Sequence, residues 1–470
     1  MEYNLEFNKN NYTVKTLTLD NQTITYRAYE NIVYVKNPVD INFNIMNIFI
    51  PEAYYEGNSI GNYTAETAPI FFPNTVGGYM PGPPGIPGKN FWDGKINSIF
   101  VALSRGYVVA APGARGRVTQ DENGLYTGKA PACIVDLKAA IRYLRYNAKA
   151  IPGDTEKIIS NGTSAGGALS SLLGITGNNV DYEPYLKELG AADARDDIFA
   201  ASCYCPITNL DNADMAYEWL FNGINDYHKI VFKLEGDKPK LSTVHGTMTE
   251  SQINISNDLK AMFPKYLNDL GLKKFDGTVL SLDTNGDGNF KDYIKSFVIS
   301  SAQKALDGGT DLSEELTCIT IKNGIITDID FDKYIKYATR MKPTCAFDDF
   351  SLNTPENELF GTSTIRAQHF TKFSKDYSTA NGSLADATIV KMMNPMHYIG
   401  TEGTTTSHFW RIRHGAIDRD TSFAIPTILA TKLENNGFDV DFTFPWGQGH
   451  GGDYDLDELF AWVDKICVHK

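Results

Sequence analysis

Two blocks of the chain alternate between short apolar strands and helices, and this alternation restricts the folds open to it. In the first block, residues 133–147 place Ile134, Leu137 and Ile141 on one helical face, and residues 107–111 form a continuous apolar run. Such alternation indicates βαβ units and a parallel sheet covered by helices. The expected elements of this block are helix 96–104, strand 107–111, helix 133–147, strand 158–159, helix 168–173 and strand 198–205.

The alternation stops near residue 205 and resumes near residue 408. The second block predicts strand 408–414, helix 421–436, strand 440–444 and helix 455–465. The intervening residues are rich in Lys, Asn and Asp, with short helices broken by Gly. We therefore predict one α/β domain from residues 1–204 and 397–470, with residues 205–396 inserted as a lid or cap. Short β-branched runs in the first 55 residues predict antiparallel strands.

The composition excludes several classes of protein. Hydrophobic residues make up 42% of the 470 residues, enough for a large core, and 43 Lys and Arg against 57 Asp and Glu give a net charge of −14. Without a dense basic cluster, this charge argues against nucleic-acid and membrane partners. We separately expect a monomer that acts on a small molecule. No apolar run approaches the roughly 20 residues that span a membrane. The polar N-terminus predicts no secretory signal and a cytoplasmic location, although a processed secreted chain would have the same features.

Two short motifs bear on metal binding. Six cysteines are too few for a disulfide scaffold, and the C-x-C pair of Cys203 and Cys205 is a poor zinc signal without a second pair. Residues 283–289 (DTNGDGN) match the first half of a calcium loop. The candidate ligands are Asp283, Asn285 and Asp287. Ile294 stands where a bidentate Glu would fall, so a structural Ca²⁺ site and a metal-free turn both stay open.

The segment around Ser164 carries the clearest chemical signal. It reads G-T-S-A-G from Gly162 to Gly166, between the β-branched pair at 158–159 and a helix of small residues. A serine at such a tight strand-to-helix turn needs small neighbours, and its hydroxyl is exposed beside a helix N-terminus whose free N–H groups can face an oxyanion. We therefore predict that Ser164 is a nucleophile and that the N–H of Ala165 is an oxyanion donor.

A serine nucleophile of this kind needs an acid and then a histidine base later in the chain. His450 lies in the Gly-rich loop 445–453, after a predicted strand and before the last helix, where the base is expected. His414 ends another predicted strand and fits a structural histidine better. Asp418 or Asp420 can supply the acid, and the 32 residues from Asp418 to His450 allow one helix and one strand.

A second oxyanion donor should come from a loop after an early strand. Gly77 and Gly78 follow the apolar run 70–72, so the N–H of Gly78 is the candidate, although a plain Gly-Gly turn fits equally well. From Ser164 to Asp418 there are 254 residues, more than the sheet elements need. We expect the insertion to leave and re-enter at the carboxyl ends of the strands, above Ser164.

These features are typical of the α/β-hydrolase fold, and the chain closely resembles bacterial tannases, the tannin acyl hydrolases of the lactobacillus type. The resemblance runs nearly end to end. Its most specific segments are NTVGGY (74–79), NGTSAGG (161–167), DMAYEWLFNGIN (214–225), TRMK (339–342), SLNTPENELFG (351–361), WRIRHGAIDRDTSFA (410–424) and GDYDL (452–456). It implies a serine esterase that hydrolyses galloyl esters of tannins and simple gallates through an acyl-enzyme, with no catalytic cofactor.

The resemblance also implies roles for particular residues. The family's nucleophile, acid and base fall on Ser164, Asp418 and His450. Its ligands for the galloyl hydroxyls fall on Lys342, Glu356 and Asp420. Carboxylates can accept hydrogen bonds from phenolic hydroxyls, and a lysine can donate to them, so this site should reject unhydroxylated benzoate esters.

Other functions are compatible with the same residues. An esterase for other hydroxylated aromatic acids, of the feruloyl or protocatechuoyl type, could use the same triad. A non-catalytic binding protein of this fold is a second alternative, against which the complete set of nucleophile, acid and base argues. Fungal tannases and related feruloyl esterases carry cysteines beside the nucleophile and base, whereas Thr163 and Gly449 stand there in this chain, which excludes that branch.

Overall fold

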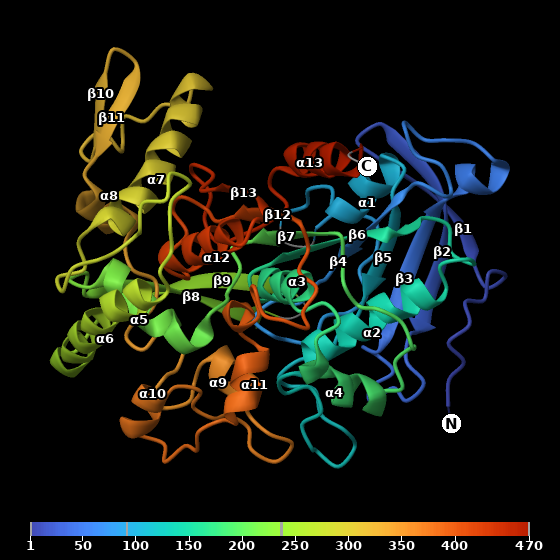
Figure 1. Cartoon of the computed structure of the whole chain (residues 1–470), viewed down its shortest axis with the longest axis horizontal. Coiled ribbons are helices and arrows are strands. Elements are labelled where there is room, and N and C mark those ends of the chain that lie inside the picture. Colours follow the sequence, from blue (N-terminus) through green and yellow to red (C-terminus); the bar gives the residue numbers. More distant parts are fainter. Residues whose placement is uncertain (1, 91–92, 236–237, 469–470) are drawn as a thin grey trace.

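A computed structural model describes residues 2–90, 93–235 and 238–468 of the chain (Figure 1). Within these ranges a nine-stranded sheet has the order β1-β2-β3-β5-β4-β6-β7-β12-β13. Its strands are β1 Thr13–Leu19, β2 Gln22–Val33, β3 Ile45–Pro51, β4 Pro69–Pro73, β5 Val108–Pro112, β6 Asp154–Thr163, β7 Ala200–Tyr204, β12 Phe409–Arg413 and β13 Asp439–Thr443. The pairs from β1 to β5 are antiparallel, and those from β5 to β13 are parallel.

Helices cover both faces of this sheet because buried side chains alternate along the strands. In β4, Ile70 and Phe72 join the buried cluster of α2, α3 and α12, whereas Phe71 packs on the other face with α1 and α13. The sheet helices are α1 Ser98–Ser104, α2 Ala132–Tyr146, α3 Ala165–Ile175, α12 Ala424–Asn435 and α13 Leu456–Val468. A parallel sheet buried on both faces is the α/β-hydrolase architecture, which confirms the predicted fold class.

Most predicted elements of the sheet domain are present within a few residues. β6 begins at Asp154, earlier than the β-branched pair at 158–159 indicated, and β1 was not anticipated. The β-branched run at residues 32–33 forms the end of β2 and no separate strand. The register of β2 shifts between Tyr29 and Ile32, where Asn31 has φ 57° and bends the strand.

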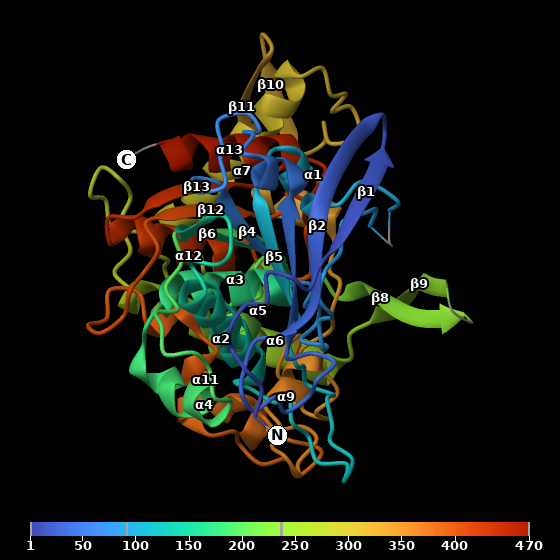
Figure 2. The same cartoon turned by 90° about the vertical axis from the view of Figure 1, so that its right-hand side faces the viewer.

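The chain between β7 and β12 carries the remaining large elements. Its helices are α5 Leu210–Phe221, α6 Glu250–Asp269, α7 Asn289–Asp307, α8 Phe331–Ala338, α9 Pro355–Leu359, α10 Lys372–Asp376, α11 Ala387–Met392 and the 3₁₀ turn η3 Pro395–His397. Two hairpins, β8 Asp226–Glu235 with β9 Lys238–Thr247 and β10 Ile319–Lys322 with β11 Ile325–Ile329, complete it. The β8–β9 hairpin projects from the body in Figure 2. Short elements elsewhere are η1 Glu52–Glu56, η2 Val180–Tyr182 and α4 Glu183–Glu188.

The predicted insertion, residues 205–396, ends close to where it starts. Nδ2 of Asn394 donates to Oδ1 of Asn209, which lies just after β7, at 3.1 Å. β12 is parallel to its neighbour β7, with Phe409 opposite Ala200, so the chain must then return to the amino end of the sheet. Residues 397–408 do so along the end of α3, where the N–H of Ser407 donates to the carbonyl of Gly174 at 2.6 Å.

Two further expectations concern the cysteines and the membrane. All six cysteines are free and buried, as predicted. Among the described residues, no helix is both long and apolar enough to cross a lipid bilayer.

Candidate active site

The turn between β6 and α3 presents Ser164 in a strained conformation. Ser164 has φ 61° and ψ −121°, a region that costs a non-glycine residue about 1–3 kcal/mol. A Cβ on Gly162 would lie 2.3 Å from the carbonyl oxygen of Gly166, and one on Gly166 would lie 2.6 Å from Oδ1 of Asn74. The two glycines of the motif are therefore required by close backbone packing around the serine.

His450 and Asp418 complete a hydrogen-bonded chain with this serine. Nε2 of His450 lies 2.8 Å from Oγ of Ser164, and Nδ1 lies 2.9 Å from Oδ2 of Asp418. Asp418 is 1% exposed, and its other oxygen accepts the N–H of Asp420 at 2.8 Å. The three residues come from the carboxyl ends of β6, β12 and β13, the edge where ligands bind in open α/β sheets.

The loop that carries His450 is fixed from both sides. Asp453 accepts hydrogen bonds from Nδ2 of Asn161 at 2.9 Å and from Oγ of Ser98 at 2.7 Å. The N–H of Ile417 donates to the carbonyl of Gln448 at 3.0 Å, which joins this loop to the acid loop. The imidazole is thereby oriented before any substrate arrives.

Neighbouring charges lower the pKa of Asp418 and raise the pKa of His450. Burial alone would raise the pKa of Asp418, but the neighbouring His450 and His414 lower it to about 2. Burial alone would lower the pKa of His450, but the carboxylates of Asp418 and Asp420 raise it above its ordinary value. Asp418 is thus an anion that stabilises an imidazolium on His450.

His414 lies close to the acid but outside the hydrogen-bonded chain. It is fully buried, and its Nδ1 lies 3.6 Å from Oδ2 of Asp418. Neither ring nitrogen has a hydrogen-bond partner among the described residues. Burial lowers the pKa of His414, so the ring is neutral near pH 7.

Two backbone N–H groups converge on the nucleophile. Ala165 is the first residue of α3, so its N–H has no partner within the helix, and Gly78 lies in the loop after β4. Within the described residues neither N–H donates to a protein acceptor. Nδ2 of Asn74 donates to the carbonyl of Gly166 at 3.1 Å and so ties the Gly78 loop to the serine turn.

Three charged side chains gather beside the triad. Nζ of Lys342 lies 3.0 Å from Oδ1 of Asp420, and that oxygen is 3.9 Å from Nε2 of His450. The hydroxyl of Tyr217 accepts the N–H of Lys342 at 3.0 Å and donates to the carbonyl of Arg419, so it holds the lid against the acid loop. Burial raises the pKa of Glu356, which is only 7% exposed, although Lys342 opposes this shift.

A cavity of about 400 Å³ joins all of these groups. It is lined by Ser164, His450, Gly78, Ala165, Lys342, Glu356 and Asp420. Lys229, Ile230, Gln252 and Asp349 also line the cavity, and sequence reasoning missed them. No local motif marks these four residues, because the lid fold alone brings them to the site.

Comparisons with known proteins agree with this geometry. Residues 93–223 match the BD-FAE family model, and a comparison with curated proteins gave no match. A tannase from Fusobacterium nucleatum is 52% identical, with 99% of this chain and 100% of that chain covered and a TM-score of 0.95. A tannase from Lactobacillus plantarum is 48% identical, with 99% and 100% covered and a TM-score of 0.96. The chain belongs to the tannase family.

A third solved structure is a tannin acyl hydrolase in complex with ethyl gallate. It is 48% identical, with 98% of this chain and 99% of that chain covered and a TM-score of 0.93. The alignments with all three structures include the lid as well as the sheet domain of this tannase.

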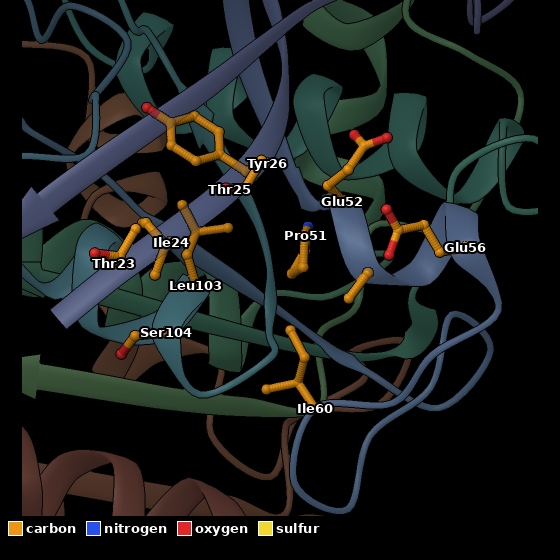
Figure 3. A pocket seen from close by; sticks show the side chains of 11 residues that line it. Thr23, Ile24, Thr25, Tyr26, Pro51, Glu52, Glu56, Ile60, Leu103 and Ser104 are labelled. Carbon is orange, nitrogen blue, oxygen red and sulfur yellow. The ribbon is translucent and has the colours of Figure 1, made fainter.

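A second cavity, of about 470 Å³, lies away from the triad of this tannase (Figure 3). It is lined by residues of β2, η1 and α1, among them Thr23, Glu52 and Ser104. Glu52 is already paired with Arg27 at 2.9 Å, and no histidine lines the cavity. It therefore lacks the groups that ester hydrolysis needs.

The predicted calcium-loop residues lie in a turn of the lid between α6 and α7. Oδ1 of Asp283 accepts the N–H groups of Asn285 at 2.8 Å and of Asp287 at 3.0 Å. Nζ of Lys291 lies 3.0 Å from Asp287, and Ile294 is fully buried.

Proposed function

We propose that this tannase hydrolyses the galloyl esters of tannins and of simple gallates through an acyl-enzyme on Ser164. The observation that carries the proposal is the set of Lys342, Glu356 and Asp420, which lines the same cavity as the nucleophile and its base. Three charged groups match the three adjacent hydroxyls of a galloyl ring.

In the first half-reaction His450 accepts the Ser164 proton as Oγ attacks the ester carbonyl. The N–H groups of Ala165 and Gly78 stabilise the oxyanion that forms. The protonated His450 then donates its proton to the departing alcohol, which leaves a galloyl ester on Ser164. In the second half-reaction His450 activates water, which releases gallic acid, so protein side chains carry every proton.

Asp418 is the triad acid in this mechanism, and Asp420 contacts the substrate. The assignment rests on the 2.9 Å contact of Asp418 with Nδ1 of His450, which fixes the tautomer whose Nε2 can accept a proton. Asp420 instead shares its carboxylate with Lys342 at the cavity wall.

The acyl-ring subsite has both donors and acceptors for phenolic hydroxyls. Lys342 can donate to a hydroxyl or stabilise a phenolate, and Glu356 and Asp420 can accept. Glu356 is buried, and Lys342 and Asp420 are 17% and 16% exposed and paired with each other. An ester without matching hydroxyls would therefore leave Glu356 without a hydrogen-bond donor from the ring.

The test is a series of methyl esters that differ only in the acyl ring. Each lost pairing with a charged group is worth about 1.5–3 kcal/mol, or ~10–150-fold in kcat/KM. The kcat/KM for methyl gallate should therefore be higher than that for methyl protocatechuate or methyl ferulate. A higher kcat/KM for ferulate would favour the feruloyl-esterase alternative.

All the groups named above come from one chain, and we propose that the enzyme acts as a monomer. No residue of a second copy is needed to complete the triad, the oxyanion donors or the acyl-ring subsite.

The contacts of the 283–289 loop favour a metal-free turn over a structural Ca²⁺ site. A cation would have to displace Lys291 from Asp287 and compete with the N–H groups on Asp283. We therefore expect the same melting temperature in EDTA and in millimolar Ca²⁺. A rise with Ca²⁺ that Asp283→Asn abolishes would establish the metal site instead.

A further inference from the structure

A buried thiol adjoins the catalytic triad. Cys205 follows β7 directly, is fully buried, and lies 3.4 Å through Sγ from the carbonyl oxygen of Gly451, the residue after His450. Sγ of Cys205, a carboxylate oxygen of Asp418 and a ring nitrogen of His450 all lie within 4.8 Å of one another. Tetrahedral metal bonds of about 2.0–2.3 Å place ligand atoms roughly 3.3–3.8 Å apart, so metal binding requires these side chains to move closer than the 4.8 Å limit.

The surroundings of this cluster favour a cation. Asp418 and Asp420 both lie beside His450. Lys342 pairs with Asp420, and a metal ion on Asp418 would take the place of the positive charge of a protonated His450. The fully buried His414 lies 3.6 Å from Asp418 and has no hydrogen-bond partner within the described ranges, so an unused imidazole faces the same carboxylate.

We propose that a soft divalent cation, Zn²⁺ or Cd²⁺, binds Cys205, Asp418 and His450 and inhibits hydrolysis. Thiolate, imidazole and carboxylate are the ligand types that zinc prefers, and sulfur adds affinity for cadmium. Binding releases the thiol proton of Cys205. A metal ion on Nδ1 of His450 replaces the proton that Asp418 accepts, and that proton moves to Nε2, which then cannot accept the proton of Ser164. The binding step stands by itself, whereas the inhibition rests on the proposed function.

Binding is measured without catalysis in the Ser164→Ala variant, which keeps all three ligands. Titration with Cd²⁺ should produce thiolate-to-cadmium absorption in the ultraviolet that saturates at one equivalent. Adding Cys205→Ser should abolish it. The matched control, Cys318→Ser, removes a thiol that donates to Glu315 in the lid and should leave the absorption unchanged.

Inhibition is measured in the otherwise native enzyme with an activated acetate ester, so the result does not depend on galloyl specificity. Cys205→Ser should raise the Cd²⁺ concentration for half-inhibition by at least ~10-fold. Even the loss of a residue that only hydrogen-bonds to a metal ligand lowers metal affinity by about 10–100-fold. EDTA should restore the native activity. Cys205→Ala serves as a second variant if the serine form does not fold.

Three outcomes would overturn the proposal. The first is the absence of cadmium absorption in Ser164→Ala. The second is equal sensitivity of the native enzyme and both Cys205 variants. The third is saturated absorption without loss of acetate hydrolysis.

Discussion

At the scale of single residues, two aspartates only two positions apart have different surroundings. Asp418 is buried against His450, whereas Asp420 faces the cavity and pairs with Lys342. Two residues of loop are enough to point one carboxylate at the base and the other at the substrate. Sequence spacing left both open as the acid, because it does not show side-chain direction.

Exchanging each of these carboxylates for an amide separates their roles. Asp418→Asn should lower kcat by about 10⁴ on every ester, because the imidazole loses its tautomer and its counter-charge. Asp420→Asn should lower kcat/KM for methyl gallate by ~10–150-fold while an activated acetate ester is still hydrolysed. The reverse pattern in steady-state kinetics would exchange the two assignments.

The raised pKa of His450 sets the lower pH limit of activity. The groups that face this ring are Asp418, Asp420, Cys205 and His414. Catalysis needs the neutral ring, so kcat/KM should fall as pH decreases through a value above 6.5, measured in EDTA. Asp420→Asn removes one carboxylate that stabilises the protonated ring, so the fall of kcat/KM should occur at a lower pH in this variant.

The control for this pH profile is Asp349→Asn, which changes a carboxylate of the cavity wall outside the main charges that raise the pKa of His450. If the low-pH fall of kcat/KM moved equally in both variants, the shift would reflect the total negative charge of the cavity and not the position of Asp420 beside His450.

Sequence reasoning worked where a residue sits in a local pattern. Ser164 follows from the glycines of its turn, and His450 from its loop after the last strand. Lys342 and Glu356 came only from the resemblance, because a single lysine after α8 and a single glutamate in α9 have no local signature of a binding site. Cys205 was dismissed as a zinc ligand, since its partners come from distant segments.

At the scale of elements, helices with a regular apolar face were predicted within a few residues, and the lid was not. The 133–147 periodicity corresponds to α2, and the 168–173 run corresponds to α3. The β8–β9 hairpin, which projects from the body in Figure 2, was not predicted from the sequence. Sequence periodicity reports burial, so elements with little burial are hard to predict.

The lid contributes to specificity through the loop after α8, which carries Lys342, and through α9, which carries Glu356. Lys342→Ala or Glu356→Ala should lower kcat/KM for methyl gallate by ~10–150-fold, since each removes one buried charge pairing with the acyl ring. Hydrolysis of a small activated acetate ester should stay near normal. The measurement is the ratio of the two kcat/KM values in each variant.

Lys372→Ala is the matched control, because this lid lysine is exposed and paired only with Asp376. Equal losses on both esters in the Lys342 variant would mean that Lys342 stabilises the fold and does not select the ring.

At the scale of the whole molecule, the insertion starts after β7 and ends beside its own beginning, where Asn394 bonds Asn209. Because β7 and β12 are parallel, residues 397–408 then run to the amino edge of the sheet before β12 begins. The insertion carries lid residues over the carboxyl edge, where Tyr217 bonds both Lys342 and the carbonyl of Arg419. The site is therefore shared between the sheet domain and the insertion.

The most direct test of the account is to trap the acyl-enzyme with an activated gallate ester, for which acylation outpaces deacylation. Acid quench and peptide mass spectrometry should find one galloyl group, on Ser164. Ser164→Ala should show no adduct and a kcat lower by roughly 10⁶. A galloyl group on another residue, or near-normal turnover of Ser164→Ala, would contradict the account.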